Sequence, residues 1–413
     1  MMILSLRSHT MRVLHLCDSL NPAGLGGYES YLHYLSMKLD IAGHQSVITS
    51  QKTMRNAPNQ VDCDYYQVRY LEGNLLEARK WEYLALPPDD RVDAARELFF
   101  DDDLEENVEI LTEELVSLVE EFRPDVVHAH STYVVFNRVL ERCSSTSMFK
   151  VLPLPATVHG LPKPLILPDG TETTDYSQLA AHCPFDTVFG VSVCVATELR
   201  AHLGTSFKRI RREYLGVDLD VFRPLGLPKR WDIAFMGRME PMKSVDLFPD
   251  IFQCLVGRNP SLRIVMTGEG SCREEMMGQF SEGGMDENVE YLGVVANDRV
   301  SRILDQSTVF LYPSRREPFG LSIVEAMACQ LPVVTSNVFG PKEIVTDNRD
   351  GILVDPEDVD MIADALWRLL DDSERRTSLG RRARVTAERR FNLDHHVERL
   401  LASYRAMMAE KKR

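Results

Sequence analysis

The sequence predicts an α/β protein with two doubly wound domains, each a mainly parallel sheet covered by helices on both faces. Short β-branched runs such as 125–128 and 333–335 alternate with longer segments of helical periodicity along the chain. The 413 residues exceed one ordinary core and suit two domains of about 200 residues each. A break rich in proline and glycine at 222–228 separates two such alternating series and is typical of an interdomain linker.

The first series, residues 1–222, is expected to form an N-terminal domain. Its periodicity predicts helices at 28–42, 106–122, 133–142 and 193–203, and strands at 12–17, 45–50, 125–130, 156–159 and 187–191. An irregular acidic stretch lies at 71–107. The stretch 160–184 carries several prolines, and because proline removes a backbone donor and fixes φ, we predict a loop there rather than a sheet.

The second series, residues 223–392, is expected to form a C-terminal domain, followed by a helix at 393–413. The pattern predicts helices at 244–257, 272–280, 297–305 and 320–329, and strands at 232–237, 262–267, 289–292, 308–312 and 333–335. The tail from 359 onward is helical by periodicity and is interrupted near Phe391 and Asn392. Strand order cannot be obtained from these patterns.

Charge and composition exclude several classes of protein. The formal net charge of −15 argues against nucleic acid as a partner. Membrane contact is expected only through local basic patches, such as Lys208, Arg209, Arg211 and Arg212. No apolar run approaches the roughly 18 residues that span a bilayer, and residues 1–10 do not resemble a signal peptide. The eight scattered cysteines predict reduced, mostly buried thiols in a cytoplasmic protein, without a disulfide framework or zinc site.

The most informative motif is the block 316–328, where a predicted strand leads through a loop into a helix. Gly320 allows a close approach of the backbone to a ligand. The N–H groups of Gly320, Leu321 and Ser322 would lie at a helix N-terminus, which favours anions. Glu317 and Glu325 flank this site, and carboxylates beside a phosphate site suit hydrogen bonds from hydroxyl groups of a sugar and a ribose. The alternative is that Glu317 caps the helix and Glu325 lies on a solvated face.

Two cations follow the first strand after the linker. Arg238 and Lys243 suit a diphosphate, because arginine offers a fork of donors and lysine a point charge. The alternative is a pair of surface cations. The glycine-rich turn at 21–29 includes Gly26 and Gly27 and can face a phosphate, although Glu29 occupies the last glycine position of the dinucleotide fingerprint.

Histidines end two predicted strands of the first domain. His159 ends strand 156–159 and could hydrogen-bond a donor sugar, or be a structural residue. His128 and His130 alternate on one face of strand 125–130. We reject them as metal ligands, because no third ligand at useful spacing accompanies them in the sequence. The turn 268–270, which contains Gly268, can approach a nucleotide.

With these motifs the chain resembles glycosyltransferase family 4 of the GT-B fold over nearly its whole length. The block from Glu317 to Glu325 carries the resemblance most specifically. Other matching segments are the turn Gly26-Gly27, Gly43-His44, 125–130, His159-Gly160, 216–218 with 222–224, Gly237-Arg238 with Lys243, 268–270 and 351–356.

The resemblance implies an architecture and an activity. Two Rossmann-like domains would face a cleft, with the acceptor bound by 1–222 and the nucleotide-sugar donor by 223–392, and the helix 393–413 would cross back to the first domain. The implied enzyme is a retaining, metal-independent hexosyltransferase without cofactors. It would move a sugar from a nucleotide diphosphate, UDP before GDP or ADP, to a hydroxyl of a glycan, lipid-linked or small-metabolite acceptor.

The resemblance also assigns roles. Arg238 and Lys243 would neutralise the diphosphate, Glu317 would hold the donor sugar, Glu325 the ribose, and His159 would lie near the sugar. The leaving phosphate would accept the acceptor proton, so that no carboxylate nucleophile is needed, unlike in a retaining glycosidase. The remaining implied donor-site residues are Gly26, Gly27, Gly268, Phe319, Gly320, Leu321 and Ser322.

Departures and alternatives accompany this resemblance. Members of the family usually have glycine directly after the motif lysine, where this chain has Ser244; serine can cap the following helix. The stretches 71–107 and 160–184 match no motif and are predicted to form the acceptor wall. The alternative functions are a GT-B nucleotide-sugar epimerase and a non-catalytic relative that binds nucleotide-sugar or a partner protein. The intact carboxylate and cation pairs argue against both.

Overall fold

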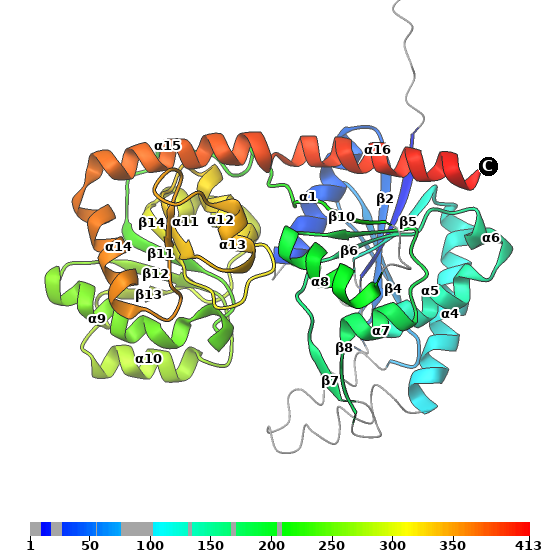
Figure 1. The fold of residues 1–413 in the computed structure, drawn as a ribbon, viewed down its shortest axis with the longest axis horizontal. Coiled ribbons are helices and arrows are strands. Elements are labelled where there is room, and N and C mark those ends of the chain that lie inside the picture. Colours follow the sequence, from blue (N-terminus) through cyan, green and yellow to red (C-terminus); the bar gives the residue numbers. More distant parts are fainter. Residues whose placement is uncertain are drawn as a thin grey trace, which may run out of the picture.

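The computed structural model describes residues 10–17, 27–54, 56–75, 102–130, 134–166, 171–204 and 209–413. Within these residues the N-terminal half contains one large sheet, formed by β1 (Arg12–Cys17), β2 (Gln45–Gln51), β3 (Gln60–Asp62), β4 (Gln67–Leu71), β5 (Val126–Ala129), β6 (Pro155–Val158), β9 (Thr187–Gly190) and β10 (Ile210–Arg212). The strand order is β10-β9-β6-β5-β1-β2-β4-β3, and β3 alone pairs antiparallel. Helices surround this sheet (Figure 1): α1 (Gly27–Ile41), α4 (Asp102–Phe122), α5 (Val134–Ser144), α6 (Ser147–Lys150), α7 (Asp175–Ala181) and α8 (Val193–Leu203).

The C-terminal half contains a second sheet, which is parallel throughout. Its order is β13-β12-β11-β14-β15-β16, with β11 (Trp231–Met236), β12 (Ile264–Thr267), β13 (Val289–Tyr291), β14 (Ser307–Tyr312), β15 (Val333–Ser336) and β16 (Ile352–Val354). Its helices are α9 (Phe248–Arg258), α10 (Arg273–Glu282), α11 (Asn297–Asp305), α12 (Leu321–Ala328), α13 (Phe339–Ile344) and α14 (Val359–Asp371). The predicted class, two doubly wound α/β units, is confirmed.

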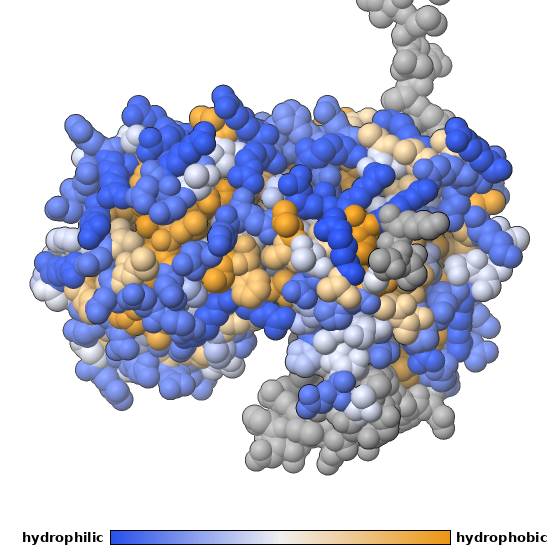
Figure 2. Space-filling model, viewed as in Figure 1, coloured by the Kyte–Doolittle hydropathy of each residue, from blue (hydrophilic) through white to orange (hydrophobic). Residues whose placement is uncertain are grey.

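The two helices at the C-terminus run along both units. α15 (Ser373–Arg390) lies on the second unit and α16 (Leu393–Lys411) on the first (Figure 1). The Tyr404 hydroxyl of α16 lies 2.5 Å from His128 Nδ1 in β5, and the Tyr31 hydroxyl of α1 lies 2.8 Å from His396 Nε2. The tail therefore crosses back to the first unit, as predicted. In the same view, the surface along α15 and α16 carries mainly hydrophilic residues (Figure 2).

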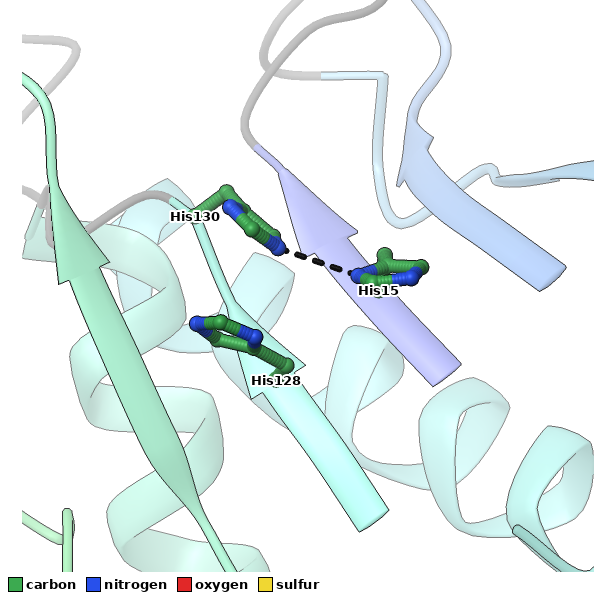
Figure 3. Close-up of side chains that lie close together, drawn as sticks. All are labelled: His15, His128 and His130. Atoms are coloured by element: carbon green, nitrogen blue, oxygen red, sulfur yellow. Dashed lines mark hydrogen bonds between the residues drawn. The ribbon is translucent and has the colours of Figure 1, made fainter. Parts of the chain in front are cut away.

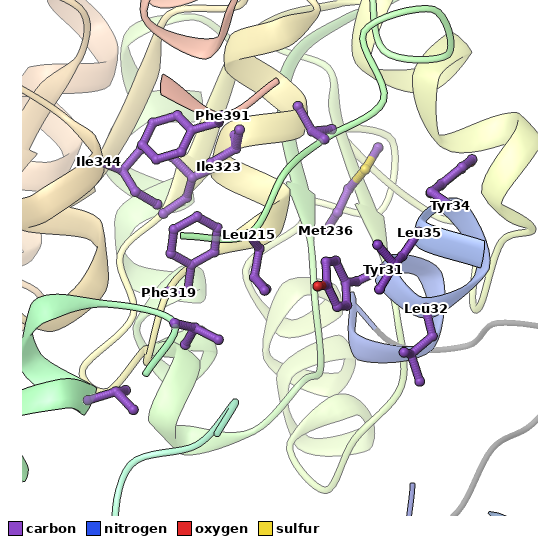
Figure 4. Close-up of a cluster of buried hydrophobic side chains, with 14 of the residues drawn as sticks. Tyr31, Leu32, Tyr34, Leu35, Leu215, Met236, Phe319, Ile323, Ile344 and Phe391 are labelled. Atoms are coloured by element: carbon purple, nitrogen blue, oxygen red, sulfur yellow. The ribbon is translucent and has the colours of Figure 1, made fainter. Parts of the chain in front are cut away.

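Apolar contact continues between the two units. Tyr31 and Leu35 of α1 point toward Met236 at the end of β11 (Figure 4). Phe319 is 3% exposed, and its ring packs 5.8 Å from the ring of Phe391, centroid to centroid. The side chain of Phe319, which the sequence placed in the donor site, is therefore part of the apolar core. Its backbone is also engaged, since the Phe319 N–H donates to Glu317 Oε1 and Gly340 packs against the Phe319 carbonyl.

The prediction of a loop at 160–184 is wrong for part of that stretch. β7 (Pro164–Ile166) and β8 (Glu172–Thr174) form an antiparallel pair, and α7 follows directly. Pro164 is tolerated because it is the first residue of its strand in a two-stranded sheet, where a missing N–H costs little. The helix predicted at 244–257 is also shorter than expected. Two short 3₁₀ turns, η1 (Pro241–Lys243) and η2 (Val245–Leu247), precede α9.

Candidate active site

The candidate residues of the second unit lie where its strand order reverses. β11 and β14 are neighbours, although the chain continues from them toward opposite edges of the sheet. In doubly wound sheets, ligands bind outside the carboxyl ends of the strands at such a point. β11 leads into Arg238 and Lys243, whereas β14 ends at Tyr312 and leads into Glu317. Topology therefore brings these residues together from distant parts of the chain.

Lys243, Tyr312 and Glu317 form a polar cluster that is largely buried. The Lys243 ammonium forms an ion pair with Glu317 Oε2, and the two side chains are 8% and 12% exposed. The Tyr312 hydroxyl donates a hydrogen bond of 2.8 Å to the same oxygen. Burial disfavours the lysine charge, but Tyr312 and Glu317 outweigh it and hold the pKa of Lys243 above its ordinary value. The lysine is therefore a fixed positive charge. Tyr312 was not predicted as a site residue, and only its position at a strand end could have suggested it.

A sharp turn at Gly320 opens α12. Its φ is 108°, so the backbone conformation favours glycine, and an added Cβ would also meet the end of the Ile323 side chain at 2.7 Å. Leu321 and Ser322 follow in the first turn, where backbone N–H groups lack intrahelical acceptors and favour anions. Glu317 does not cap this helix, since its Oε1 accepts from the Phe319 N–H at 3.3 Å. The capping alternative is therefore wrong.

Glu325 lies in α12 and is buried, with 9% of its surface exposed. Within the described residues no cation or hydrogen-bond donor contacts its carboxylate. Burial raises the pKa of Glu325 to about 7. The alternative of a solvated helix face is therefore wrong, and an unpaired carboxylate in such a place is typical of a functional site.

Arg238 and Gly268 lie in neighbouring turns. Arg238 is exposed and contacts Met242 Sδ at 3.7 Å. Burial raises the pKa of Glu29 in α1, and a backbone hydrogen bond and the charge of Arg238 partly offset that rise. Arg238 therefore lies close enough to α1 to act on Glu29, which places it on the side of the first unit. At Gly268 φ is 121°, and a Cβ would lie 1.9 Å from the Gly237 oxygen. The two turns touch, and only glycine fits between them.

The start of α1 brings the first unit to this site. A Cβ on Gly27 would lie 3.9 Å from Leu321 Cβ. The Tyr28 ring lies 5.0 Å from the His159 ring, centroid to centroid. Gly26 lies outside the described residues. The residues predicted from both halves of the chain therefore converge near the N-termini of α1 and α12.

A cluster of imidazoles lies under His159. Ring nitrogens of His15, His128 and His130 lie within 4.8 Å of one another (Figure 3). The prediction that His128 and His130 have no third potential ligand near them is therefore wrong, because β1 lies beside β5 and supplies His15. Both nitrogens of His128 have hydrogen-bond partners, Tyr404 Oη at 2.5 Å and Thr157 Oγ1 at 2.9 Å. Hydrogen bonds to Tyr404 and Thr157 therefore hold the His128 ring in place within the cluster.

Ser244 departs from the expected geometry. Its φ of 56° places it in the left-handed region, and it makes no side-chain cap to the following turn. Its buried hydroxyl has no hydrogen-bond partner in the described part of the chain. The prediction that this serine caps the next helix is therefore wrong, and its left-handed backbone is one that glycine adopts most easily.

We expect Ser244→Gly to stabilise the protein by about 1 kcal/mol, because it relieves the left-handed strain and removes an unsatisfied hydroxyl. Thermal unfolding should show this as a rise in Tm of roughly 2–4 °C. Ser378→Gly, inside α15, is the matched control and should lower Tm, because glycine weakens a helix interior. A fall in Tm for both variants would contradict the strain at Ser244.

The other sequence predictions concern surface features and thiols. In the basic patch, Lys208 lies outside the described residues, Arg209 pairs with Glu410, and the Arg212 guanidinium lies 4.3 Å from the Tyr214 ring centroid. Arg211 and Arg212 are both exposed, so among the described residues of the patch only Arg209 has its charge paired. Across the described residues, no helix has the length and apolar character needed to cross a membrane. None of the eight cysteines forms a disulfide; three are buried and Cys254 is exposed.

Two family models match the chain. The one described as Glycosyltransferase Family 4 matches residues 25–221, and the one described as Glycosyl transferases group 1 matches residues 220–386. The D-inositol 3-phosphate glycosyltransferase of Mycolicibacterium paratuberculosis is 35% identical over 217 residues, which are 49% of this chain and 48% of that relative. The chain spans about half the length of the curated relatives it matches.

Solved structures are similar over almost the whole chain. Sucrose-phosphate synthase from Thermosynechococcus elongatus has a TM-score of 0.76 at 20% identity, covering 97% of this chain and 100% of that one. Anabaena Alr3699/HepE in complex with UDP and glucose has a TM-score of 0.69 at 17% identity, covering 96% and 100%. At these identities the likeness shows the fold, which is GT-B. Because the two family models together extend over residues 25–386, the chain belongs to glycosyltransferase family 4.

Proposed function

We propose that the protein is a retaining, metal-independent glycosyltransferase that takes a sugar from a UDP-sugar donor. The observation that carries this proposal is the cluster of Lys243, Tyr312 and Glu317 at the switch point of the second sheet, next to the N-terminus of α12. The Anabaena structure that shares this fold holds UDP and glucose, which favours UDP as the donor nucleotide.

The donor would lie across the carboxyl ends of β11 and β14. The exposed Arg238 and the buried Lys243 would share the charge of the diphosphate, assisted by N–H groups in the first turn of α12. Glu317 would accept hydrogen bonds from the transferred sugar, and Glu325 from the ribose. His159 would face the sugar from the first unit.

In the proposed reaction, the bond between the anomeric carbon and the leaving phosphate oxygen breaks as the bond to the acceptor oxygen forms on the same face. The acceptor hydroxyl gives its proton to that phosphate oxygen. Arg238 and Lys243 stabilise the charge that develops on the phosphate, so catalysis depends on electrostatic stabilisation and positioning. No residue needs to form a covalent intermediate.

The acceptor is proposed to bind on the side of the first unit. The matched relatives are D-inositol 3-phosphate glycosyltransferases, so a polyol phosphate is the first acceptor to offer, before glycans, lipid-linked acceptors and small metabolites. Arg316, next to Glu317, donates to the Pro162 oxygen at the base of the β7-β8 pair. This contact places the start of 160–184 beside the donor loop and supports the prediction that the segment borders the acceptor.

Thermal unfolding with UDP, GDP, ADP and their sugars, each with and without EDTA, tests the donor site. A ligand at about 100 times its Kd stabilises the native state by about 2.7 kcal/mol, so the correct nucleotide should raise Tm by roughly 5–10 °C. We expect UDP and a UDP-sugar to do so, equally with EDTA. A shift that EDTA abolishes would contradict metal independence, and no shift with any nucleotide would favour a non-catalytic relative.

The donor that gives the largest shift is then incubated alone and with acceptors. Retention predicts a product whose anomeric configuration, read by NMR, equals that of the donor. An inverted product would contradict the proposed reaction. An epimerised sugar formed from donor alone would favour the epimerase alternative.

A further inference from the structure

Three imidazoles form a continuous hydrogen-bonded chain that ends at the proposed donor site. His15 Nδ1 lies 3.0 Å from His130 Nε2, and His130 Nδ1 lies 3.3 Å from His159 Nε2. His15 lies within β1, and His130 and His159 directly follow β5 and β6; the three strands are adjacent in the sheet. Figure 3 shows the first of these contacts between the rings of His15 and His130. Each contact needs one nitrogen with a proton and one without, so the tautomers of the three rings are linked.

All three rings are neutral at ordinary pH. Burial lowers the pKa of His15 and of His159 to about 3, and burial together with the neighbouring histidines lowers the pKa of His130 well below its usual value. A neutral imidazole carries a single proton on one of its two nitrogens. The chain can therefore have only two arrangements, with all three protons on Nδ1 or all three on Nε2.

The buried end of the chain decides between these two arrangements. His15 Nε2 is buried and has no hydrogen-bond partner within the described residues. If the protons were on Nε2, His15 would hold an unpaired buried N–H group, and such groups are rarer in folded proteins than unpaired acceptors. With the protons on Nδ1, only a lone pair is left unpaired. His15 then donates to His130, and His130 donates to His159.

We propose that His15 and His130 are positioning residues that fix His159 as its Nδ1–H tautomer. His159 Nε2 is occupied as an acceptor, so Nδ1 is the nitrogen left for a ligand, and it presents an N–H donor. A sugar hydroxyl meeting His159 must therefore accept the hydrogen bond. The last step rests on the proposed function, because it assumes that His159 faces the donor sugar. The tautomer itself does not depend on that assumption.

Long-range proton–nitrogen NMR spectra of the full chain labelled with ¹⁵N-histidine test the tautomer without any ligand. Imidazoles with Nδ1–H and Nε2–H give distinct nitrogen shifts and coupling patterns. We expect the Nδ1–H pattern for His15, His130 and His159 near neutral pH. An Nε2–H pattern for His159, a protonated ring, or an average of both tautomers would overturn the proposal. The wild-type spectrum is sufficient for this decision.

Two substitutions at one position separate positioning from simple packing. His130→Asn keeps an amide near the position of Nδ1 that can donate to His159 Nε2 through its N–H group or accept through its oxygen, and we expect the Nδ1–H tautomer of His159 to remain the larger population. His130→Phe keeps a ring but has no donor, and we expect the His159 signals to move to the average of two tautomers. Equal His159 patterns in both variants would overturn the relay. His395→Gln is the control. It removes an exposed histidine, which identifies the His395 signals, and it should leave the signals of the other rings unchanged.

Addition of the donor separates this inference from the proposed function. If both hold, the donor identified in the melting experiment shifts the His159 Nδ1–H resonance, and kcat/KM falls more in His130→Phe than in His130→Asn. If the ligand-free tautomer is as expected but no donor moves that resonance, the relay stands and the proposed contact of His159 with the donor is wrong.

Discussion

Lys243→Met is expected to lower kcat by about 10²–10³-fold, the range found when one preorganised donor to a developing oxyanion is removed. The structure places the Lys243 ammonium in an ion pair with Glu317 and 5.1 Å from the centre of the Tyr312 ring. In the proposed reaction, this positive charge would be in position before the leaving phosphate develops its own charge. Steady-state kinetics with the cognate donor measure the loss. Lys150→Met, at an exposed position in α6, is the matched control and should retain wild-type turnover.

The same substitution also tests the buried ion pair. Removing one partner leaves Glu317, among the described residues, with the Tyr312 hydroxyl as its remaining side-chain donor, and breaking such pairs is strongly destabilising. We therefore expect Lys243→Met to lower Tm, although the variant should still fold. The double variant Lys243→Met/Glu317→Gln should recover most of that Tm without recovering activity. Wild-type turnover in Lys243→Met would remove the proposed diphosphate role, and recovery of activity in the double variant would show that the loss reflected folding.

Local sequence patterns predicted most of the elements, because buried parallel strands and amphipathic helices have distinct periodicities. β5 and β6 are buried along their whole length, and each is a short, mainly apolar segment with one polar residue, His128 or Thr157. The strand that begins at Pro164 was not predicted, because we took proline as evidence against a strand. That rule is weakest at the first residue of a strand, which is where Pro164 lies. The turns before α9 were also missed, since a proline in a first helical turn leaves the periodicity unchanged.

The residues of the site could be predicted to lie together only where they belong to one continuous sequence motif. Glu317, Gly320 and Glu325 lie within one loop and helix, so their proximity follows from sequence spacing. Tyr312 lies only five residues before Glu317, so its position at a strand end was the one local signal for it. The contact of Tyr312 with Lys243 and the position of His15 depend on which strands are neighbours, and strand order leaves no local signal in the chain. His15 in particular joins His128 and His130 only because β1 pairs with β5.

Glu325→Gln is expected to change stability and donor binding in opposite directions. The pKa of Glu325 is about 7 in the folded chain, against an ordinary value of 4.5. The folded state therefore binds more protons between these two pH values, and stability falls as pH rises from about 4.5 to 7. A shift of this size corresponds to about 3 kcal/mol. Because glutamine carries no charge, the variant should exceed wild type in Tm by on the order of 5 °C at pH 8 and match it near pH 4.

Donor binding should respond with the other sign. If the Glu325 carboxylate accepts hydrogen bonds from the ribose, a neutral amide loses about 1.5–3 kcal/mol of charge-assisted bonding, which raises the donor KM roughly 10–100-fold. Glu287→Gln, at an exposed position, is the control and should alter neither quantity. A pH-independent difference in Tm would contradict the titration of a buried carboxylate. Burial of this carboxylate costs stability at the pH where the enzyme would work, so its burial needs a compensating role. An unchanged KM together with the expected Tm profile would show that this role is not ribose binding.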